Sequence, residues 1–188
     1  MGKPEGQLAS TAVALEEADL GPRVQPTFDV PDLAGQRIGL LLTPEDCAAD
    51  RLDPLPTPAG LFAWTEPVKR SVRPTAPAVD AFAAQAVESA VTASEARFGL
   101  SCVRAEADEP TAEALARWAQ DLALDCIVTP RLPLGPTRKA VHAACSSQGL
   151  TLVEVTRPYD QAVWPHARAG FFGLKKKIPA ILASLSLA

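Results

Sequence analysis

Short continuous runs of apolar residues alternate along this chain with longer segments in which apolar residues recur every three to four positions. The runs span 38–43, 61–64, 100–105, 126–129 and 150–155, and polar residues, proline or glycine bound them. Continuous apolar runs of this length are typical of strands covered on both faces, as in a parallel sheet. The pattern therefore predicts five buried strands.

The segments between the last four runs have helical periodicity. In 77–98 the apolar residues follow the i, i+3, i+4, i+7 spacing of one helix face. They are Val79, Phe82, Ala83, Ala86, Val87, Ala90, Val91 and Phe98. Thr75 is placed to cap this helix and Gly99 to end it in the left-handed conformation. Two further helices are predicted from 110 to about 124 and from 135 to 148.

Strands that alternate with helices across tight connections are typical of right-handed βαβ crossovers. The fold predicted for residues 36–158 is therefore an α/β, doubly wound, mostly parallel five-stranded sheet with helices on both faces, Rossmann-like in class. Residues 1–35 are rich in proline and read as a linker or strap, with a short helix over 8–20. Residues 159–188 form an aromatic and helical C-terminal tail, kinked or broken at Pro179, that packs on the domain or on a partner.

Composition narrows the functional classes. The net charge of −4 disfavours non-specific binding of nucleic acid by the whole surface. The start of the chain shows no secretory pattern, and the longest apolar stretch, 178–188, is too short to span a bilayer. The four cysteines lack metal-ligand spacing, so we expect reduced structural thiols and a cytoplasmic location.

No catalytic constellation and no metal-binding set of acidic residues is found in the sequence. A doubly wound sheet binds ligands beyond the carboxyl ends of its strands. Neither G-x-G-x-x-G nor G-x-x-x-x-G-K-[ST] follows a predicted strand, which disfavours a conventional dinucleotide or P-loop site. No cofactor is implied by a motif.

The loop after the fourth run and the helix start that follows it form the most site-like segment. A glycine at a helix start lets backbone amides approach an anion, and adjacent basic residues add charge. The ligand-binding candidates are Thr129, Arg131, Gly135, Thr137 and Arg138. The alternative interpretation is a helix that begins at a proline and carries a solvated basic turn.

The tail supplies a second set of candidates. Its large apolar side chains exceed what a free terminus normally exposes, so we expect it to pack on another surface. The interface candidates are Tyr159, Trp164, His166, Phe171 and Phe172. His166 is either a proton carrier or a structural histidine in an aromatic corner. Lys175–Lys177 is either a solvated face or a contact with an acidic partner or a nucleic-acid backbone.

Two segments carry a family resemblance. Residues 104–155 include Asp125-Cys126-Ile127-Val128-Thr129-Pro130-Arg131 and Gly135-Pro136-Thr137-Arg138, and the tail reads Tyr159-Asp160-x-x-x-Trp164-Pro165-His166-Ala167-x-x-Gly170-Phe171-Phe172. The first segment resembles the α/β domain of DNA photolyases and cryptochromes. The second resembles the C-terminus of bacterial photolyase-related flavoproteins, in which a helical FAD-binding domain comes first and the α/β domain follows.

The resemblance implies an α/β module, structural or associated with a chromophore, that is not catalytic by itself. The parent family would be a light-dependent lyase of DNA repair. FAD would belong to the helical domain, DNA would be reached only through the parent protein, and the tail would pack against the helical domain. The loop Thr43-Pro44-Glu45-Asp46 departs from the L-R-x-x-D-N-type motif of photolyases, so an antenna chromophore is not assigned.

The residues are also compatible with two other functions. One is a free-standing, Rossmann-like protein that binds a nucleotide or a phosphometabolite. The other is a protein-interaction module whose tail docks on a partner.

Overall fold

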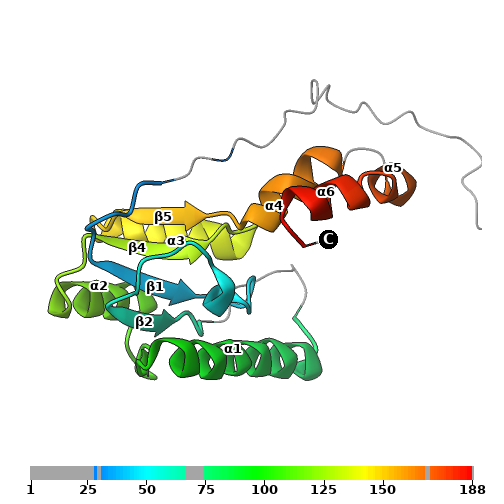
Figure 1. Ribbon diagram of the computed structural model, residues 1–188. Coiled ribbons are helices and arrows are strands. Elements are labelled where there is room, and N and C mark those ends of the chain that lie inside the picture. The colour runs from blue at the N-terminus through cyan, green and yellow to red at the C-terminus, as the bar shows by residue number, and fades with distance from the viewer. Residues whose placement is uncertain (1–27, 29–30, 67–73, 168–169, 188) are drawn as a thin grey trace, which may run out of the picture.

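Five parallel strands form the centre of the molecule, seen in a computed structural model that describes residues 28, 31–66, 74–167 and 170–187 (Figure 1). The strands are β1 (Ile38–Leu42), β2 (Gly60–Ala63), β3 (Cys102–Val103), β4 (Cys126–Pro130) and β5 (Leu152–Val155). Their order in the sheet is β3-β2-β1-β4-β5, and every neighbouring pair is parallel. The predicted α/β, doubly wound sheet is confirmed, with all of its strands parallel.

Helices cover both faces of this sheet. Helix α1 (Pro77–Phe98) and the short 3-10 helix η1 (Ala49–Arg51) pack on one face, around Leu40 and Leu42. Helices α2 (Thr111–Asp121) and α3 (Pro136–Ser147) pack on the other. Alternate residues of the buried β1 strand therefore point into two different cores, which explains why the strand is apolar at every position.

The connection from β1 to β2 departs from the usual doubly wound pattern. It is a loop that contains η1, whereas the other connections each contain an α-helix of eleven residues or more. In dinucleotide-binding folds the helix after the first strand directs its amino terminus at the pyrophosphate. In this chain that helix is replaced by a single 3-10 turn.

Helix α1 has the predicted bounds, and Gly99 ends it with φ of 66°. Its buried face is shorter than the sequence pattern predicts: Val87 and Val91 are buried, but Val79 and Phe82 are exposed. The amino-terminal half of α1 extends past the carboxyl ends of the strands, where it has no sheet to cover (Figure 1). Thr75 does not cap the helix, because its hydroxyl donates to the Asp80 carboxylate at 2.7 Å.

Helix α2 approaches the sheet closely over β1 and β2. Gly39 and Gly60 are partners in the parallel register, and the indole of Trp118 lies over both. A Cβ at Gly60 would lie 3.1 Å from Trp118 Nε1, and one at Gly39 would collide with the Trp118 ring and with Leu124. The two glycines therefore make room for a large aromatic side chain at the centre of the core.

The tail is a set of short helices, so the helical tail expected from the sequence is broken rather than kinked. These are α4 (Pro158–Val163), η2 (Trp164–His166), α5 (Phe171–Lys175) and α6 (Ile178–Ser184). Pro179 stands in the first turn of α6, where a proline is tolerated because no helical N–H is lost, so it begins a helix rather than kinking one. Ile181 is buried and α6 contacts α4, so the described part of the tail is folded.

The segment before the sheet also contacts the body. Leu33 is buried with Ile38 and Val128 on the face of the sheet that also carries Leu40 and Leu42. Phe28 lies against Trp164 of the tail, with ring centroids 5.7 Å apart. The helix predicted over 8–20 falls outside the described residues. None of the helices in the described part of the chain combines the length and the apolar character needed to cross a bilayer.

Candidate functional site

The strand order reverses between β1 and β4, which is where a doubly wound sheet normally binds its ligand. The structure brings Thr129 and Thr137 to this point. Thr129 Oγ1 donates to the carbonyl of Leu41 at 3.1 Å, and Thr137 Oγ1 donates to Glu45 Oε1 at 2.7 Å. Both threonines thus join the two halves of the sheet through the protein's own hydrogen bonds.

Arg138 turns away from this point toward the edge strand. Its guanidinium donates to both carboxylate oxygens of Glu154 on β5, at 3.0 and 2.9 Å. His142 Nε2 lies 3.0 Å from the same carboxylate. Burial alone would raise the pKa of Glu154, but the hydrogen bonds and charges of Arg138 and His142 hold it below its usual value. The positive charge of Arg138 is therefore already neutralised by the protein.

Gly135 and Arg131, the two remaining candidates, are described by the space and the side chains around them. Gly135 has an extended φ of 165°, and a Cβ built there would meet no atom within 4 Å. The Arg131 guanidinium lies 5.8 Å from the centroid of the Phe28 ring and 5.7 Å from that of the Trp164 ring. This spacing is that of a cation–π contact, which links Arg131 to the segment before the sheet and to the tail.

At the same carboxyl edge of the sheet lies an ion pair whose residues were not among the ligand-binding candidates from the sequence. Arg157, two positions after the end of β5, donates to Asp46 Oδ1 at 2.7 Å and to the carbonyl of Ala48 at 2.6 Å. The hydrogen bond with Asp46 raises the pKa of Arg157. An acidic residue after the first strand and a basic one after the last are the sequence signal that could have indicated this pair.

The crevice between β1 and β4 is therefore occupied by contacts within the chain. Glu45 and Asp46 stand where a phosphate loop would offer glycine amides, and a carboxylate there repels a phosphate. The geometry therefore does not favour the anion site expected at the loop between β4 and α3.

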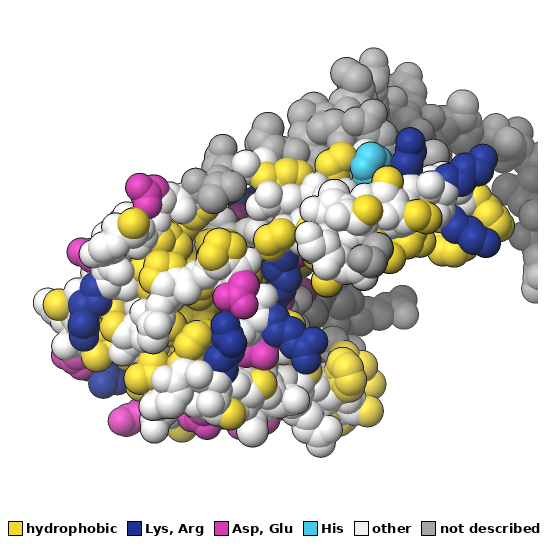
Figure 2. Space-filling model, in the orientation of Figure 1, with side chains coloured by type: hydrophobic (Ala, Val, Ile, Leu, Met, Phe, Trp, Pro, Cys, Tyr) yellow, Lys and Arg dark blue, Asp and Glu magenta, His cyan; other side chains and the backbone are white. Residues whose placement is uncertain are grey.

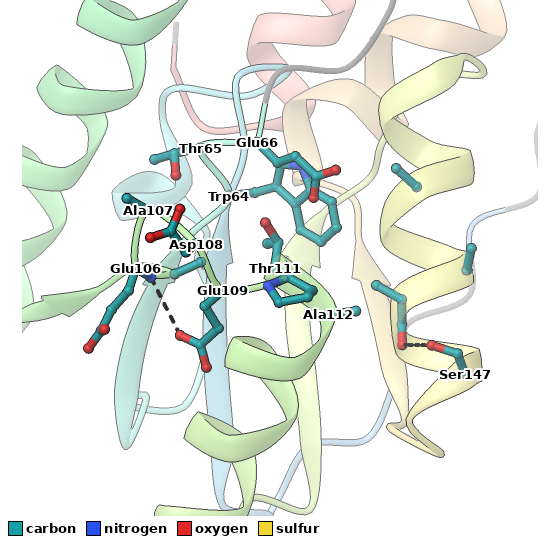
Figure 3. Close-up of a pocket in the computed structure, with 15 residues that line it drawn as sticks. Trp64, Thr65, Glu66, Glu106, Ala107, Asp108, Glu109, Thr111, Ala112 and Ser147 are labelled. Carbon is teal, nitrogen blue, oxygen red and sulfur yellow. Dashed lines mark hydrogen bonds between the residues drawn. The ribbon is translucent and has the colours of Figure 1, made fainter.

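A wider depression lies on the face covered by α2 and α3, and we call it the α2–α3 groove (Figure 3). Its volume is about 770 Å³. It is lined by Trp64, Thr65 and Glu66 after β2, by 105–112 before and at the start of α2, and by Ala140, Ala143, Ala144 and Ser147 of α3. Figure 3 shows Trp64 between the turn that carries Glu106, Ala107 and Asp108 on one side and the helix that carries Ser147 on the other.

The groove combines small apolar side chains with acidic ones, two of which no described residue neutralises. Glu66 and Asp108 are exposed and make no hydrogen bond or ion pair with another described residue. Glu109, in contrast, is paired with Arg117 at 2.7 Å. Trp64 is buried, and its Nε1 has no hydrogen-bond partner among the described residues. A ligand of this groove would have to be cationic, apolar or both.

The tail carries the largest collection of exposed aromatic side chains in the described part of the chain. Phe172 is 79% exposed, Phe171 63% and Tyr159 52%. We use the name tail surface for Tyr159, Trp164, Phe171, Phe172, Ile178 and Leu187. Figure 2 shows hydrophobic and basic side chains side by side at the outer end of the tail. Three exposed lysines, Lys175–Lys177, follow the two phenylalanines.

His166 is exposed in η2 and makes no hydrogen bond or ion pair with another described residue, so no proton-transfer partner stands beside it in the described part of the chain. The four cysteines are not joined in disulfides, and burial raises the pKa of Cys102 and Cys145 to about 11. Thiols with such pKa values are poor nucleophiles. Across the described ranges, no group of three or more His, Cys, Asp and Glu side chains could hold a metal ion.

The described residues thus offer two surfaces for recognition, the acidic α2–α3 groove and the aromatic tail surface, and no assembled catalytic set. Comparison of the chain with protein-family models, with curated proteins and with solved structures finds no match in any of the three.

Proposed function

We propose that this chain is the α/β module of a photolyase- or cryptochrome-like flavoprotein and that it docks on a helical FAD-binding domain through its tail surface. The observation that carries the proposal is the exposure of Phe171, Phe172 and Tyr159 on a folded tail. Side chains of this size are usually covered, and aromatic residues are enriched at protein interfaces.

The anchoring of the tail supports the same conclusion. Ile181 is buried and Trp164 contacts Phe28 and Arg131, so the tail is held against the body while Phe171 and Phe172 face outward. An element fixed on one side and apolar on the other is suited to join two domains. The photolyase-like tail residues 159–172 include most of this surface. FAD and any DNA contact belong to the helical partner in this proposal.

The proposal is tested by binding between two purified proteins. The first is this chain, and the second is the helical FAD-binding domain of a bacterial photolyase-related flavoprotein, followed by its flavin absorption. We expect a complex in which Phe171→Ser/Phe172→Ser weakens binding at least about tenfold, because two central aromatic contacts are lost.

The matched control is Phe82→Ser. Phe82 is 73% exposed, as exposed as the tail phenylalanines, but it lies on α1. It should leave binding unchanged. Absence of a complex, or equal weakening by Phe82→Ser, would overturn the proposal.

A free-standing nucleotide-binding protein is the second candidate, favoured by the position of the α2–α3 groove at the carboxyl ends of β2 and β3. The carboxylates of Glu66 and Asp108, which no described residue pairs with, oppose it because they repel phosphate. Thermal unfolding with and without AMP or ATP separates the two candidates. A rise in melting temperature would favour the nucleotide.

A further inference from the structure

The α2–α3 groove and the tail surface have complementary chemistry. The groove is lined by alanine side chains, by Trp64 and by the carboxylates of Glu66 and Asp108. The outer end of the tail has the apolar rings of Phe171 and Phe172, and three lysines begin three positions after Phe172. Each surface therefore presents an apolar area beside a charged one, with opposite signs.

The charges on both surfaces have no ion-pair partner among the residues that the structure describes. Glu66 and Asp108 make no ion pair with another described residue, and neither do Lys175, Lys176 and Lys177. Glu109, which also lines the groove, is instead paired with Arg117. Unpaired charges of opposite sign on two surfaces attract each other and orient their approach.

The dimensions also agree. A depression of about 770 Å³ lies within the range of pockets that hold drug-sized ligands, so it can take two phenylalanine rings and the adjoining turn. Figure 1 shows α5 at the outer end of the tail, on the opposite side of the molecule from α2. Helix α6, which follows α5, contacts α4. A chain in this conformation presents its tail to another molecule rather than to its own groove.

We propose that the α2–α3 groove receives residues 171–177 of a second copy of this chain. Phe171 and Phe172 enter the alanine-lined part, and Lys175–Lys177 face Glu66 and Asp108. Two copies can exchange tails reciprocally, which gives a closed dimer with two identical contacts. This contact goes beyond the proposed function, because the groove has no part in docking the helical domain. Both use the same phenylalanines, so the helical domain and the second copy compete for the tail.

Sedimentation velocity of the full chain over a wide concentration series tests the proposal. The wild-type chain should form dimers at low salt and dissociate as salt is added, because exposed charges are screened. Two variants reverse the charges: Glu66→Lys/Asp108→Lys in the groove and Lys175→Glu/Lys176→Glu in the tail. Each alone should weaken self-association at least about tenfold.

An equimolar mixture of the two variants should dimerise again. The basic groove of one variant then faces the acidic tail of the other, and the acidic groove faces the basic tail. The matched control compares two single variants, Asp108→Lys in the groove and Asp121→Lys at the far end of α2. Asp121→Lys makes the same change of charge outside the groove, so this variant should associate as wild type. Circular dichroism establishes that every variant is folded.

A chain that stays monomeric at every concentration overturns the inference, as do groove variants that associate like wild type or a mixture that fails to dimerise. These failures are distinct from a failure of the proposed function. Glu66 and Asp108 are not part of the tail surface, so the complex with the helical domain can form whether or not the groove variants dissociate.

Discussion

Glu154 is the residue at which helix α3 is joined to the edge strand β5. Its carboxylate accepts two hydrogen bonds from Arg138 and lies 3.0 Å from His142 Nε2. The side chains of Glu154 and Arg138 are 14% and 32% exposed, so this pair is partly shielded from water. Partly buried, bidentate pairs are stronger than ordinary surface ion pairs.

This pair predicts a stability that depends on pH. The folded state lowers the pKa of Glu154 below its ordinary value of 4.5, so the ionised form stabilises the fold above that value. The stabilisation is lost as the pH falls through the folded pKa. Glu154→Gln should therefore lower the free energy of unfolding by about 1 kcal/mol at neutral pH. Urea unfolding of both proteins from pH 7 into the acid range measures this.

In the same experiment the difference between wild type and Glu154→Gln should shrink below pH 4.5. A difference that stays constant across the acid range would show that the carboxylate charge is not what stabilises the β5 edge.

Thr137 and Arg138 show how far residue chemistry could be read from the sequence. The sequence places both at the carboxyl edge of the sheet, at the start of a helix, and the structure has them there. Their partners were not predictable. Glu45 is 92 positions from Thr137, and Glu154 reaches Arg138 only because β5 lies beside β4. A basic turn that looks free to bind an anion is in fact neutralised by residues that the fold brings to it.

At the scale of elements, the packing of α2 on β1 and β2 rests on two residues without side chains. Gly39→Ala would place a methyl group against the Trp118 ring and Leu124. We expect the free energy of unfolding to fall by about 1–3 kcal/mol, as in other overpacked cores. The comparison is Gly135→Ala, where a Cβ meets nothing within 4 Å and should change stability by less than about 0.5 kcal/mol.

Chemical denaturation of both glycine variants gives the measurement. If Gly135→Ala proved as costly as Gly39→Ala, the Gly135 backbone would need a freedom that its extended φ does not indicate. Equal tolerance of both substitutions would mean that α2 shifts easily on the sheet.

The elements were predicted from periodicity, and their limits follow tertiary contacts. The bounds of α1 were predicted correctly because Pro77 and Gly99 mark them chemically. The strand expected over 100–105 is reduced to Cys102–Val103, since β3 lies at the sheet edge and pairs with β2 alone. Of the break or kink expected at Pro179, the structure has a break: α5 ends at Lys175, and Pro179 stands in the first turn of α6. A proline occurs both at a kink inside a helix and in the first turn of a new helix, and the conformation of the preceding turn decides between the two.

At the scale of the whole molecule, the tail and the sheet are joined through a small set of contacts. Ile181 is 6% exposed, whereas Ile178 in the same helix is 39% exposed. Ile181→Ser should release α6, while Ile178→Ser should leave the tail in place. Hydrogen exchange measures this as faster amide exchange in α4 and α6, with unchanged exchange in β1 and β4.

Loss of protection in β1 and β4 together with α6 would contradict that picture. It would mean that the tail and the sheet unfold as one cooperative unit. Exchange in the tail that is unchanged by Ile181→Ser would show that the contacts of Trp164 with Phe28 and Arg131 are sufficient to hold it.

The central pairing of the sheet has a consequence for the order in which the chain can fold. β1 pairs with β4, so Ile38 lies beside Cys126, and the hydrogen bond from Thr129 to Leu41 closes a separation of 88 residues. On a ribosome, β1 leaves the exit tunnel long before β4 is synthesised. Until then the nascent chain exposes an apolar strand edge that a neighbouring strand or a chaperone can bind. Synthesis of α2 and β4 is the step after which that edge is covered.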